Sequence, residues 1–204
     1  MVVLPLLLST LLVAAPGAAD RPPLDVVLYF EALCPDCQDF ISGGFADAWR
    51  AVPEILNVTL VPWGFATATP DGDGWRFTCQ HGREECRGNK LHACGVRQAP
   101  SSGASVDFSV CLEAERPEEE CADDNGLDWD ALERCVDDPD TDAIMLRYRD
   151  LTDDARPEIV EVPTVSVDGS RRHQDDMLDD FLEFVCNAWQ GETPPGCLQR
   201  VDLD

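Results

Sequence analysis

The sequence predicts an α/β fold in which a small sheet is flanked by helices and interrupted by a helical insertion that disulfides hold together. Three observations predict it. A β-forming apolar run over residues 24–30 leads into Cys34-Pro35-Asp36-Cys37 and then into a helix. Most of the cysteines follow in a region, about 75–158, that has little strand-like alternation. A second β segment then begins at Val162-Pro163-Thr164 and precedes an amphipathic helix.

The first part of the core is predicted as strand, helix and strand. Residues 24–30 have the length and composition of a buried strand. A helix is predicted from Cys37 to about Val52, weakened and kinked at Gly43-Gly44 and ended by Pro53. Residues 58–63 form the second predicted strand, and the turn-rich stretch 69–74 indicates a two-stranded tip.

The insertion is predicted to be helical over residues 84–94, 104–115, 129–136 and 140–151. The acidic stretch 113–124, which contains a proline, is predicted to be a solvated loop without a binding role.

After the insertion, Val165 and Val167 alternate as in a strand, and Asp168-Gly169 indicates a β-hairpin turn. The last helix is predicted over residues 174–189. This order of elements is thioredoxin-like. We therefore expect one domain over residues 20–204, with the insertion covering the edge that carries the cysteine pair.

Cys34 and Cys37 lie where a strand meets a helix N-terminus, whose free N–H groups and dipole stabilise a thiolate. This position indicates thiol–disulfide exchange, with the more exposed Cys34 as nucleophile and Cys37 as the resolving thiol. Half of a zinc site is the alternative, but a second C-x-x-C pair is missing from the sequence. A structural disulfide rarely spans two residues at a helix start.

Val162 and Pro163 are the predicted substrate-positioning residues. In thioredoxin-like folds the matching proline is cis and faces the cysteine pair, so we expect a cis Val162–Pro163 bond here. An ordinary proline at a strand edge is the alternative.

Residues 1–19 resemble a signal peptide, because an apolar run is followed by small residues. We expect no membrane span in the rest of the chain. A secretory route implies an oxidising compartment, in which eight of the ten cysteines would form four structural disulfides of unknown pairing. Asn57-Val58-Thr59 is a glycosylation sequon. The eight structural cysteines are Cys79, Cys86, Cys94, Cys111, Cys121, Cys135, Cys186 and Cys197.

The formal net charge of −25 argues against nucleic-acid binding, which needs basic patches, and against binding to anionic membranes. The acidity indicates either solubility or tolerance of an acidic compartment, and composition does not choose between them.

Residues 79–94 read C-Q-H-G-x-x-E-C-x-x-N-x-x-x-x-C. This pattern, with Cys34-x-x-Cys37 upstream, closely resembles the signature of gamma-interferon-inducible lysosomal thiol reductases. The resemblance covers most of the chain after residue 19. It implies a soluble, glycosylated, thioredoxin-like enzyme that reduces protein disulfides at acid pH in endosomes and lysosomes, or after secretion, and that is linked to antigen processing or innate immunity. It also implies a small-thiol or protein-thiol electron donor, and we expect no cofactor.

The cluster of Cys79, His81, Cys86 and Cys94 is an alternative zinc site, but cysteines of a secretory chain are more often disulfide-bonded, so no metal site is predicted. His81 is expected either to form a local hydrogen bond or to lie near the active pair. His92 and His173 are predicted at the surface.

Two other functions compete with a reductase. A secretory-pathway oxidase or isomerase would differ in reduction potential, and the sequence ends in Val-Asp-Leu-Asp without an endoplasmic-reticulum retention signal. A non-enzymatic, disulfide-rich binding protein would not need Cys34 and Cys37.

Overall fold

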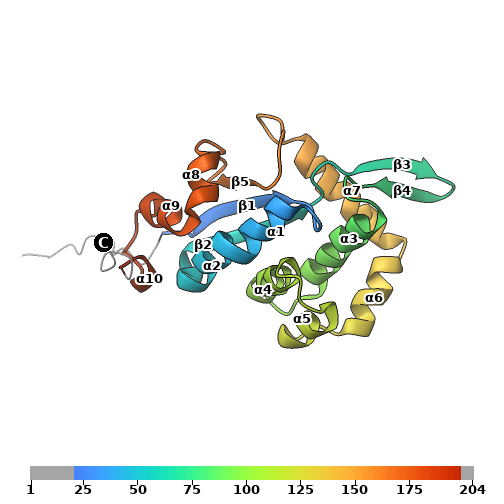
Figure 1. Ribbon diagram of the computed structural model, residues 1–204, viewed down its shortest axis with the longest axis horizontal. Helices are drawn as coiled ribbons and strands as arrows, with labels where there is room; N and C mark the ends of the chain where they lie inside the picture. The colour runs from blue at the N-terminus through green and yellow to red at the C-terminus, as the bar shows by residue number, and fades with distance from the viewer. Residues whose placement is uncertain (1–20, 199–204) are drawn as a thin grey trace, which may run out of the picture.

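The computed structural model describes residues 21–198, so the predicted signal peptide over residues 1–19 lies outside the described part (Figure 1). Within residues 21–198, no helix is long and apolar enough to cross a membrane. The elements of the core before the insertion are β1 (Leu24–Phe30), α1 (Pro35–Phe40), a π-helical turn (Ile41–Phe45), α2 (Ala46–Ala51), a 3-10 turn (Pro53–Ile55) and β2 (Leu56–Pro62). The elements after the insertion are β5 (Thr164–Val167), α8 (Gln174–Asp179), α9 (Phe181–Ala188) and α10 (Pro195–Leu198).

The central sheet has the strand order β2-β1-β5. Strand β1 runs parallel to β2, with Val26 opposite Val58, and antiparallel to β5, with Val26 opposite Val167. A parallel pair needs a crossover, and the helical segment from α1 to α2 supplies it. Apolar residues predominate in β1, because helices cover both of its faces.

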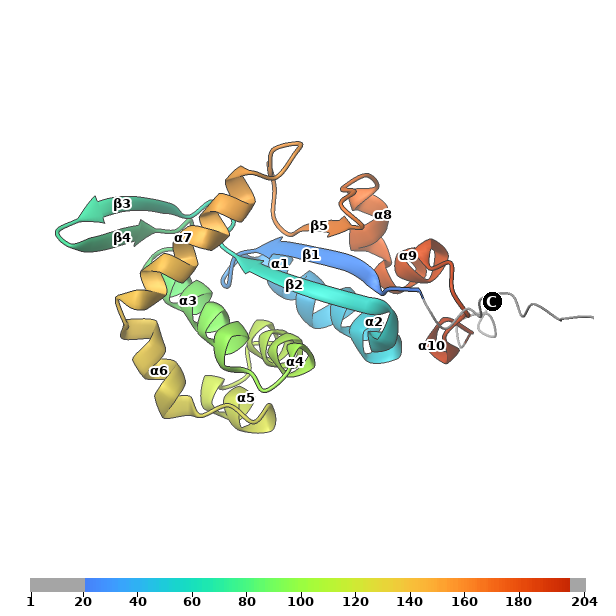
Figure 2. The same ribbon diagram turned by 180° about the vertical axis from the view of Figure 1, so that it is seen from behind.

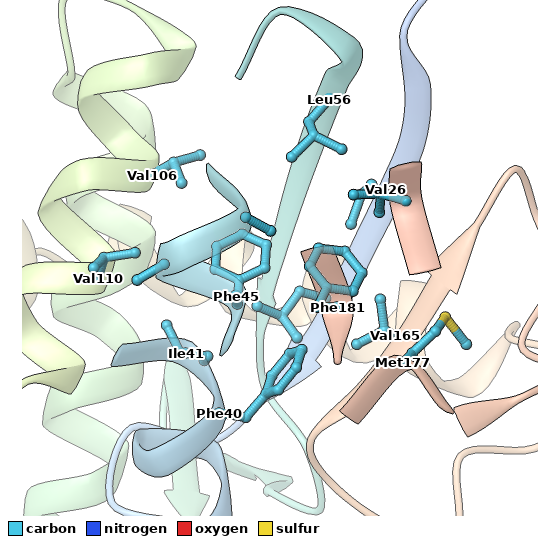
Figure 3. Packing of buried hydrophobic residues seen from close by; sticks show 14 of the residues in the cluster. Val26, Phe40, Ile41, Phe45, Leu56, Val106, Val110, Val165, Met177 and Phe181 are labelled. Carbon is cyan, nitrogen blue, oxygen red and sulfur yellow. The ribbon is translucent and has the colours of Figure 1, made fainter. Parts of the chain in front are cut away.

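Alternate residues of β1 enter two hydrophobic clusters. Val26, Leu28 and Phe30 belong to the cluster that packs against α1, α2, α4 (Ser102–Glu113), α8 and α9. There Phe181 of α9 contacts the rings of Phe40 of α1 and Phe45 of the π-helical turn (Figure 3). Tyr29 belongs to the cluster on the opposite face, which α7 (Asp140–Asp153) covers (Figure 2). Because successive side chains of β1 point to opposite faces of the sheet, this strand packs against the helices on both sides.

The predicted weak point in the first helix is present. Gly43 has φ −99° and ψ −107°, outside the helical region, and the helix widens around it before α2 begins. Phe45 and Ile41 on either side of Gly43 remain fully buried, so the break redirects the helix without exposing its apolar face.

Between β2 and β5, an antiparallel ribbon is followed by five helices (Figure 1). The helices build a third hydrophobic cluster around Leu91, Phe108 and Leu132, separate from the sheet. These elements are β3 (Thr67–Asp71), β4 (Gly74–Thr78), α3 (Arg83–Gln98), α4 (Ser102–Glu113), α5 (Glu118–Asp124), α6 (Trp129–Asp137) and α7 (Asp140–Asp153).

The prediction of a solvated loop over residues 113–124 was wrong. Glu113 is buried at the end of α4, and residues 118–124 form α5, in which Cys121 is fully buried. The three glutamates of its first turn lie at the positive end of the helix, where acidic residues are favourable. The acidic composition therefore marked a helix start and not a loop.

The predicted turn at Asp168-Gly169 is present, but the hairpin is reduced to a single bridge. Strand β5 ends at Val167 in a tight turn through Asp168 and Gly169, closed by a bridge from Val167 to Ser170, and the described chain then enters α8 without a second strand. The Asp168 side chain accepts a hydrogen bond of 2.9 Å from the Asp25 N–H, which fixes the turn to the start of β1.

The last predicted helix is divided in two. Asp180, with φ −145° and ψ 84°, separates α8 from α9, and its side chain caps α9 by accepting from the Glu183 N–H at 3.0 Å. The apolar stripe survives the break, because Met177, Phe181 and Val185 are all fully buried. A capping aspartate thus turned one continuous helical pattern into two helices.

Candidate functional site

Cys34 occupies the N-cap position of α1, directly before Pro35 at the first helical position. Its backbone is extended, with φ −74° and ψ 117°, and its carbonyl accepts the first helical hydrogen bond from the Gln38 N–H at 3.0 Å. The thiol of Cys34 therefore lies beside the free N–H groups of a helix N-terminus, which favour negative charge. Only 6% of the residue is exposed.

Cys37 lies one turn further along α1 and is fully buried. Burial raises the pKa of the Cys37 thiol, a hydrogen bond from the Glu31 backbone offsets part of this, and the hydrogen bond with Cys34 raises the pKa further. Burial therefore favours the neutral thiol of Cys37, and Cys34 is the slightly more accessible of the two buried cysteines. Both cysteines are free, and the other eight form disulfides.

The Val162–Pro163 peptide bond is cis, and it lies opposite the cysteine pair. The Cys34 thiol donates to the Val162 carbonyl at 3.7 Å, which brings together residues from both ends of the core. A depression of about 390 Å³ separates α1 from this segment, and Asp36, Val162 and Pro163 are among its lining residues. The structure thus assembles Cys34, Cys37, Val162 and Pro163 into one site.

The helices α3 and α4 of the insertion, with the start of α5, form the wall on the other side of the cysteine loop. Ala32 and Leu33 of that loop and Gly88 of α3 line a depression of about 240 Å³. Gly88 lies so close to the loop that a Cβ atom there would be 2.7 Å from the Ala32 Cβ. Asn89 accepts a hydrogen bond of 2.9 Å from the Ala32 N–H. The insertion therefore holds the loop that carries Cys34.

Asn89 and Glu113 are site residues that the sequence analysis did not single out. The fixed asparagine of the 79–94 pattern was the available signal for Asn89. Nothing in the sequence indicated that Glu113 is buried, because it begins the acidic stretch 113–124. Asn57 of the sequon is exposed on β2, and its side-chain N–H donates to Asp25 at 2.8 Å.

The disulfides are Cys79–Cys86, Cys94–Cys135, Cys111–Cys121 and Cys186–Cys197. The first three lie within the 75–158 region, and the fourth ties α9 to α10. These pairings leave none of the three cysteines of the 79–94 pattern as a free thiolate to ligate zinc.

The prediction that His92 is a surface residue was wrong, because its side chain is buried. Its Nδ1 lies 3.0 Å from the Ser109 hydroxyl, its Nε2 lies 2.8 Å from Glu113 Oε1, and its ring meets the edge of Phe30 at the end of β1. His173, in contrast, is exposed. A buried polar cluster therefore underlies the helices that support the cysteine loop.

Burial raises the pKa of Glu113, and the hydrogen bond with His92 offsets part of that rise. The titratable groups that act on Glu113 are His92 and Glu85 of α3, and the Glu113 charge in turn acts on Cys37. A carboxyl whose pKa is raised on folding stabilises the fold while protonated, and this contribution is lost as pH rises from its unfolded value of about 4.5 through its folded value.

We therefore expect the Glu113→Gln variant to lose less stability than the unaltered protein as pH rises above about 4.5, the unfolded pKa of a glutamate. Urea unfolding midpoints at several pH values would measure this difference. Glu119→Gln, an exposed change on α5, is the matched control, and its urea midpoint should change with pH as it does in the unaltered protein. Parallel pH profiles for the Glu113 variant and the unaltered protein would contradict the expectation.

Comparisons with known proteins identify a family that this chain matches. The family model described as gamma interferon inducible lysosomal thiol reductase (GILT) matches residues 25–137. The gamma-interferon-inducible lysosomal thiol reductase of Carassius auratus is 30% identical over 190 residues, covering 88% of this chain and 74% of the relative. The protein of the same name from Mus musculus is 32% identical over 197 residues, covering 89% and 74%.

Among solved structures, BdbD from Bacillus subtilis has a TM-score of 0.60 at 16% identity, covering 81% of this chain and 87% of that chain. Chlamydia trachomatis DsbA has a TM-score of 0.58 at 12% identity, covering 84% and 90%. Structural similarity at such low sequence identity is evidence for the fold alone. They confirm the predicted α/β fold with a thioredoxin-like core.

Proposed function

Because this chain belongs to the gamma-interferon-inducible lysosomal thiol reductase family and is a thiol–disulfide oxidoreductase, we propose that it reduces protein disulfides at acid pH in endosomes and lysosomes. In this proposal Cys34 is the nucleophile, Cys37 is the resolving thiol, and Val162 and Pro163 position the substrate.

One observation carries the assignment of the site. Of the ten cysteines, Cys34 and Cys37 alone are free, and they lie at a helix N-terminus opposite the cis Val162–Pro163 bond. A scaffold protein would not need two unpaired thiols where a thiolate is stabilised, so the arrangement favours an enzyme over a disulfide-rich binding protein.

The reaction follows from the different surroundings of the two cysteines. The Cys34 thiolate attacks one sulfur of the substrate disulfide, a Cys34–substrate bond forms, and the other substrate sulfur leaves as a thiolate that takes up a proton. Cys37 then loses its proton and attacks the Cys34 sulfur, which releases the second substrate thiol. The substrate has gained two electrons and two protons, and the enzyme now holds a Cys34–Cys37 disulfide.

A small-thiol or protein-thiol donor must return two electrons to this disulfide before the next cycle. The depressions on both sides of Cys34, about 390 and 240 Å³, suit an unfolded segment crossing the site better than they suit a small enclosed ligand. Disulfide-bonded, unfolded proteins are therefore the proposed substrates.

Operation at acid pH is supported by the buried Glu113. Because its pKa is raised, the Glu113 carboxyl is neutral over a wider pH range than an exposed glutamate. The buried cluster of Glu113 and His92 should therefore be most stable in acid. The family name and the exposed Asn57, proposed as a glycosylation site, support a route through the secretory pathway to lysosomes or out of the cell. The signal peptide over residues 1–19, the single domain over residues 20–204 and a link to antigen processing or innate immunity belong to the same proposal.

The deciding experiment is reduction of a denatured, disulfide-bonded immunoglobulin at about pH 4.5 and about pH 7, with a small thiol as donor. We expect activity at acid pH that Cys34→Ser abolishes. The Cys186→Ala/Cys197→Ala variant, which removes a distant disulfide, is the control for cysteine loss in general and should remain active.

Each competing function has a distinct outcome in this assay. A lack of Cys34-dependent activity at both pH values would overturn the proposal in favour of a binding protein. Efficient oxidation of reduced substrates by the Cys34–Cys37 disulfide, with a reduction potential close to that of strong oxidants, would instead identify a secretory-pathway oxidase.

A further inference from the structure

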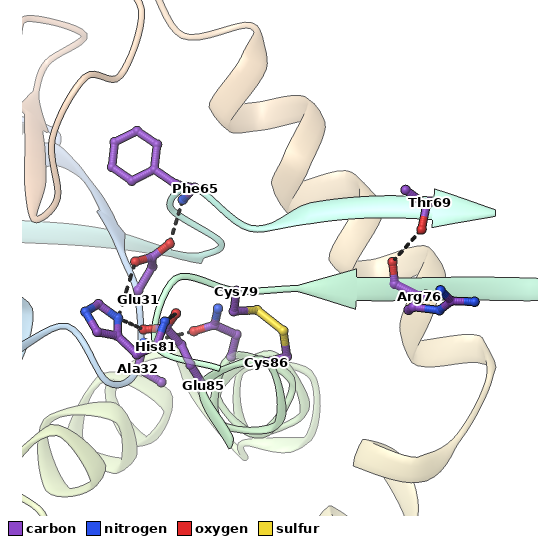
Figure 4. Close-up of a disulfide and its surroundings, with 10 residues drawn as sticks. Glu31, Ala32, Phe65, Thr69, Arg76, Cys79, His81, Glu85 and Cys86 are labelled. Atoms are coloured by element: carbon purple, nitrogen blue, oxygen red, sulfur yellow. Dashed lines mark hydrogen bonds and ion pairs between the residues drawn. A yellow bond between two sulfur atoms is a disulfide. The ribbon is translucent and has the colours of Figure 1, made fainter. Parts of the chain in front are cut away.

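A second group of ionisable side chains lies behind the cysteine loop, and the proposed chemistry does not use it. Glu31 follows β1, His81 lies in the turn before α3, and Glu85 is in the first turn of α3 (Figure 4). One oxygen of each carboxylate and one ring nitrogen of His81 all lie within 4.8 Å of one another. Both glutamates are fully buried, whereas 38% of the His81 side chain is exposed.

Backbone N–H groups orient both carboxylates in the same way. Glu31 Oε1 accepts from the Phe65 N–H at 2.7 Å, and Glu85 Oε1 accepts from the His81 N–H at 2.9 Å. The remaining oxygen of each glutamate, Oε2, faces His81 Nδ1, at 3.9 Å for Glu31 and in direct contact for Glu85. Three ligand atoms therefore converge on one point and are held there by groups that a ligand would not displace.

Glu31 Oε2 is an unsatisfied atom. It is buried and has no hydrogen-bond partner among the described residues. A buried carboxylate oxygen without a partner carries a desolvation cost that a cation would offset. In agreement with this, burial raises the pKa of Glu31 to about 7.

The surroundings of the three side chains are rigid. The Cys79–Cys86 disulfide brackets His81 and Glu85 (Figure 4). Gly64, with φ +54°, passes so close to Glu31 that a Cβ atom there would be 2.3 Å from Glu31 Cγ. Such support reduces the entropy that a ligand set loses on binding.

We propose that Glu31, His81 and Glu85 bind a divalent transition-metal ion, with zinc as the preferred ion. One imidazole nitrogen and two carboxylate oxygens suit Zn²⁺, and water entering beside the exposed His81 would complete the coordination. Bonds of about 2.1 Å place two ligands of one ion about 3–3.5 Å apart, so the Glu31–His81 spacing needs little change, while Glu85 Oε2 must withdraw from His81 by about 1 Å.

This ligand set differs from the cysteine-rich one considered from the sequence, with which it shares only His81. The sequence predicted no metal site because the clustered cysteines were expected to be disulfide-bonded, and Glu31 and Glu85, far apart in the chain, gave no sign that they meet. The proposal does not rest on the proposed reductase function, although the Glu31 carbonyl accepts from the Cys34 N–H at 3.2 Å, so a bound ion would also restrain the active-site loop.

Metal binding is best tested in the full chain with Cys34→Ser and Cys37→Ser, because free thiolates bind zinc themselves. Calorimetric titration with Zn²⁺ at about pH 7 should give one equivalent bound, and the affinity should fall at about pH 5 as the ligands take up protons. Co²⁺ should give visible absorption bands without a thiolate charge-transfer band.

In this background, Glu31→Gln and His81→Ala should each weaken Zn²⁺ binding at least ~10-fold. Glu84→Gln, an exposed change next to Glu85, is the matched control and should leave binding unaltered. If Glu31→Gln does not fold, the half-exposed His81 still decides the question. Failure to bind one equivalent, or binding that His81→Ala leaves unchanged, would overturn the proposal and leave the three residues as an ion-paired structural cluster.

Discussion

Replacing Cys37 with serine should stop turnover and trap the protein on its substrate. Without the resolving thiol, the disulfide between Cys34 and the substrate has no internal attacker, so we expect multiple-turnover activity to fall by about three orders of magnitude. The trapped complex should appear as a covalent band on a non-reducing gel and disappear when dithiothreitol is added. Serine keeps the size of the buried side chain, so the fold should be retained.

The control for this trap is the double variant Cys34→Ser/Cys37→Ser, which should form no covalent complex. A Cys37→Ser variant that turns over at the normal rate would show that a second external thiol resolves the complex, and the role of Cys37 would be wrong. Trapping by Cys34→Ser instead would reverse the roles of the two cysteines.

Removing the Cys94–Cys135 disulfide should be the most damaging change to stability. This bond joins α3 to α6 across a sequence separation of 41, so its loss releases a long loop in the unfolded chain. The chain-entropy relation gives about 4 kcal/mol for a loop of this length, or roughly a thousandfold in the folding equilibrium. Alanine is the replacement of choice, because both sulfurs lie in the hydrophobic cluster of the insertion.

Urea unfolding of Cys94→Ala/Cys135→Ala would measure this loss. The matched comparison is Cys111→Ala/Cys121→Ala, which removes the same atoms from the same cluster but a bond of sequence separation 10, and should cost about 1 kcal/mol less. An equal or greater loss for the shorter loop would show that packing, not loop entropy, dominates in this cluster.

Local patterns predicted the fold because each core element has its own signal in the sequence. The apolar run of β1, the helix that follows Cys34, the break at Gly43 and the return to β structure at Thr164 all follow from residues that are neighbours in the chain. Cys34, Cys37 and Pro163 were equally visible, because their spacing from these elements defines a familiar arrangement.

What the sequence did not predict depends on contacts between distant segments. His92 is polar and would ordinarily be exposed, but Ser109 and the Glu113 carboxylate of α4 lie next to its ring nitrogens inside the fold. The Glu31–His81–Glu85 cluster likewise exists only after β1 and α3 have packed together. The error over the acidic stretch 113–124 is local instead, because a run of glutamates is also typical of a helix start, where the positive end of the helix favours them.

The position of β5 has a consequence for biosynthesis. Its residues emerge from the ribosome only after the whole insertion, yet β5 pairs directly with β1, the central strand of the sheet. Until then the growing chain can pair β1 with β2, but the other edge of β1 stays unpaired. Pairing of strands this far apart in the sequence is slow. Val162, whose carbonyl receives the Cys34 thiol, belongs to the same late segment. The nascent protein therefore exposes Cys34 and Cys37, which stay unpaired in the folded protein, after six other cysteines have already been synthesised. Disulfides between the wrong cysteines are the hazard at this stage.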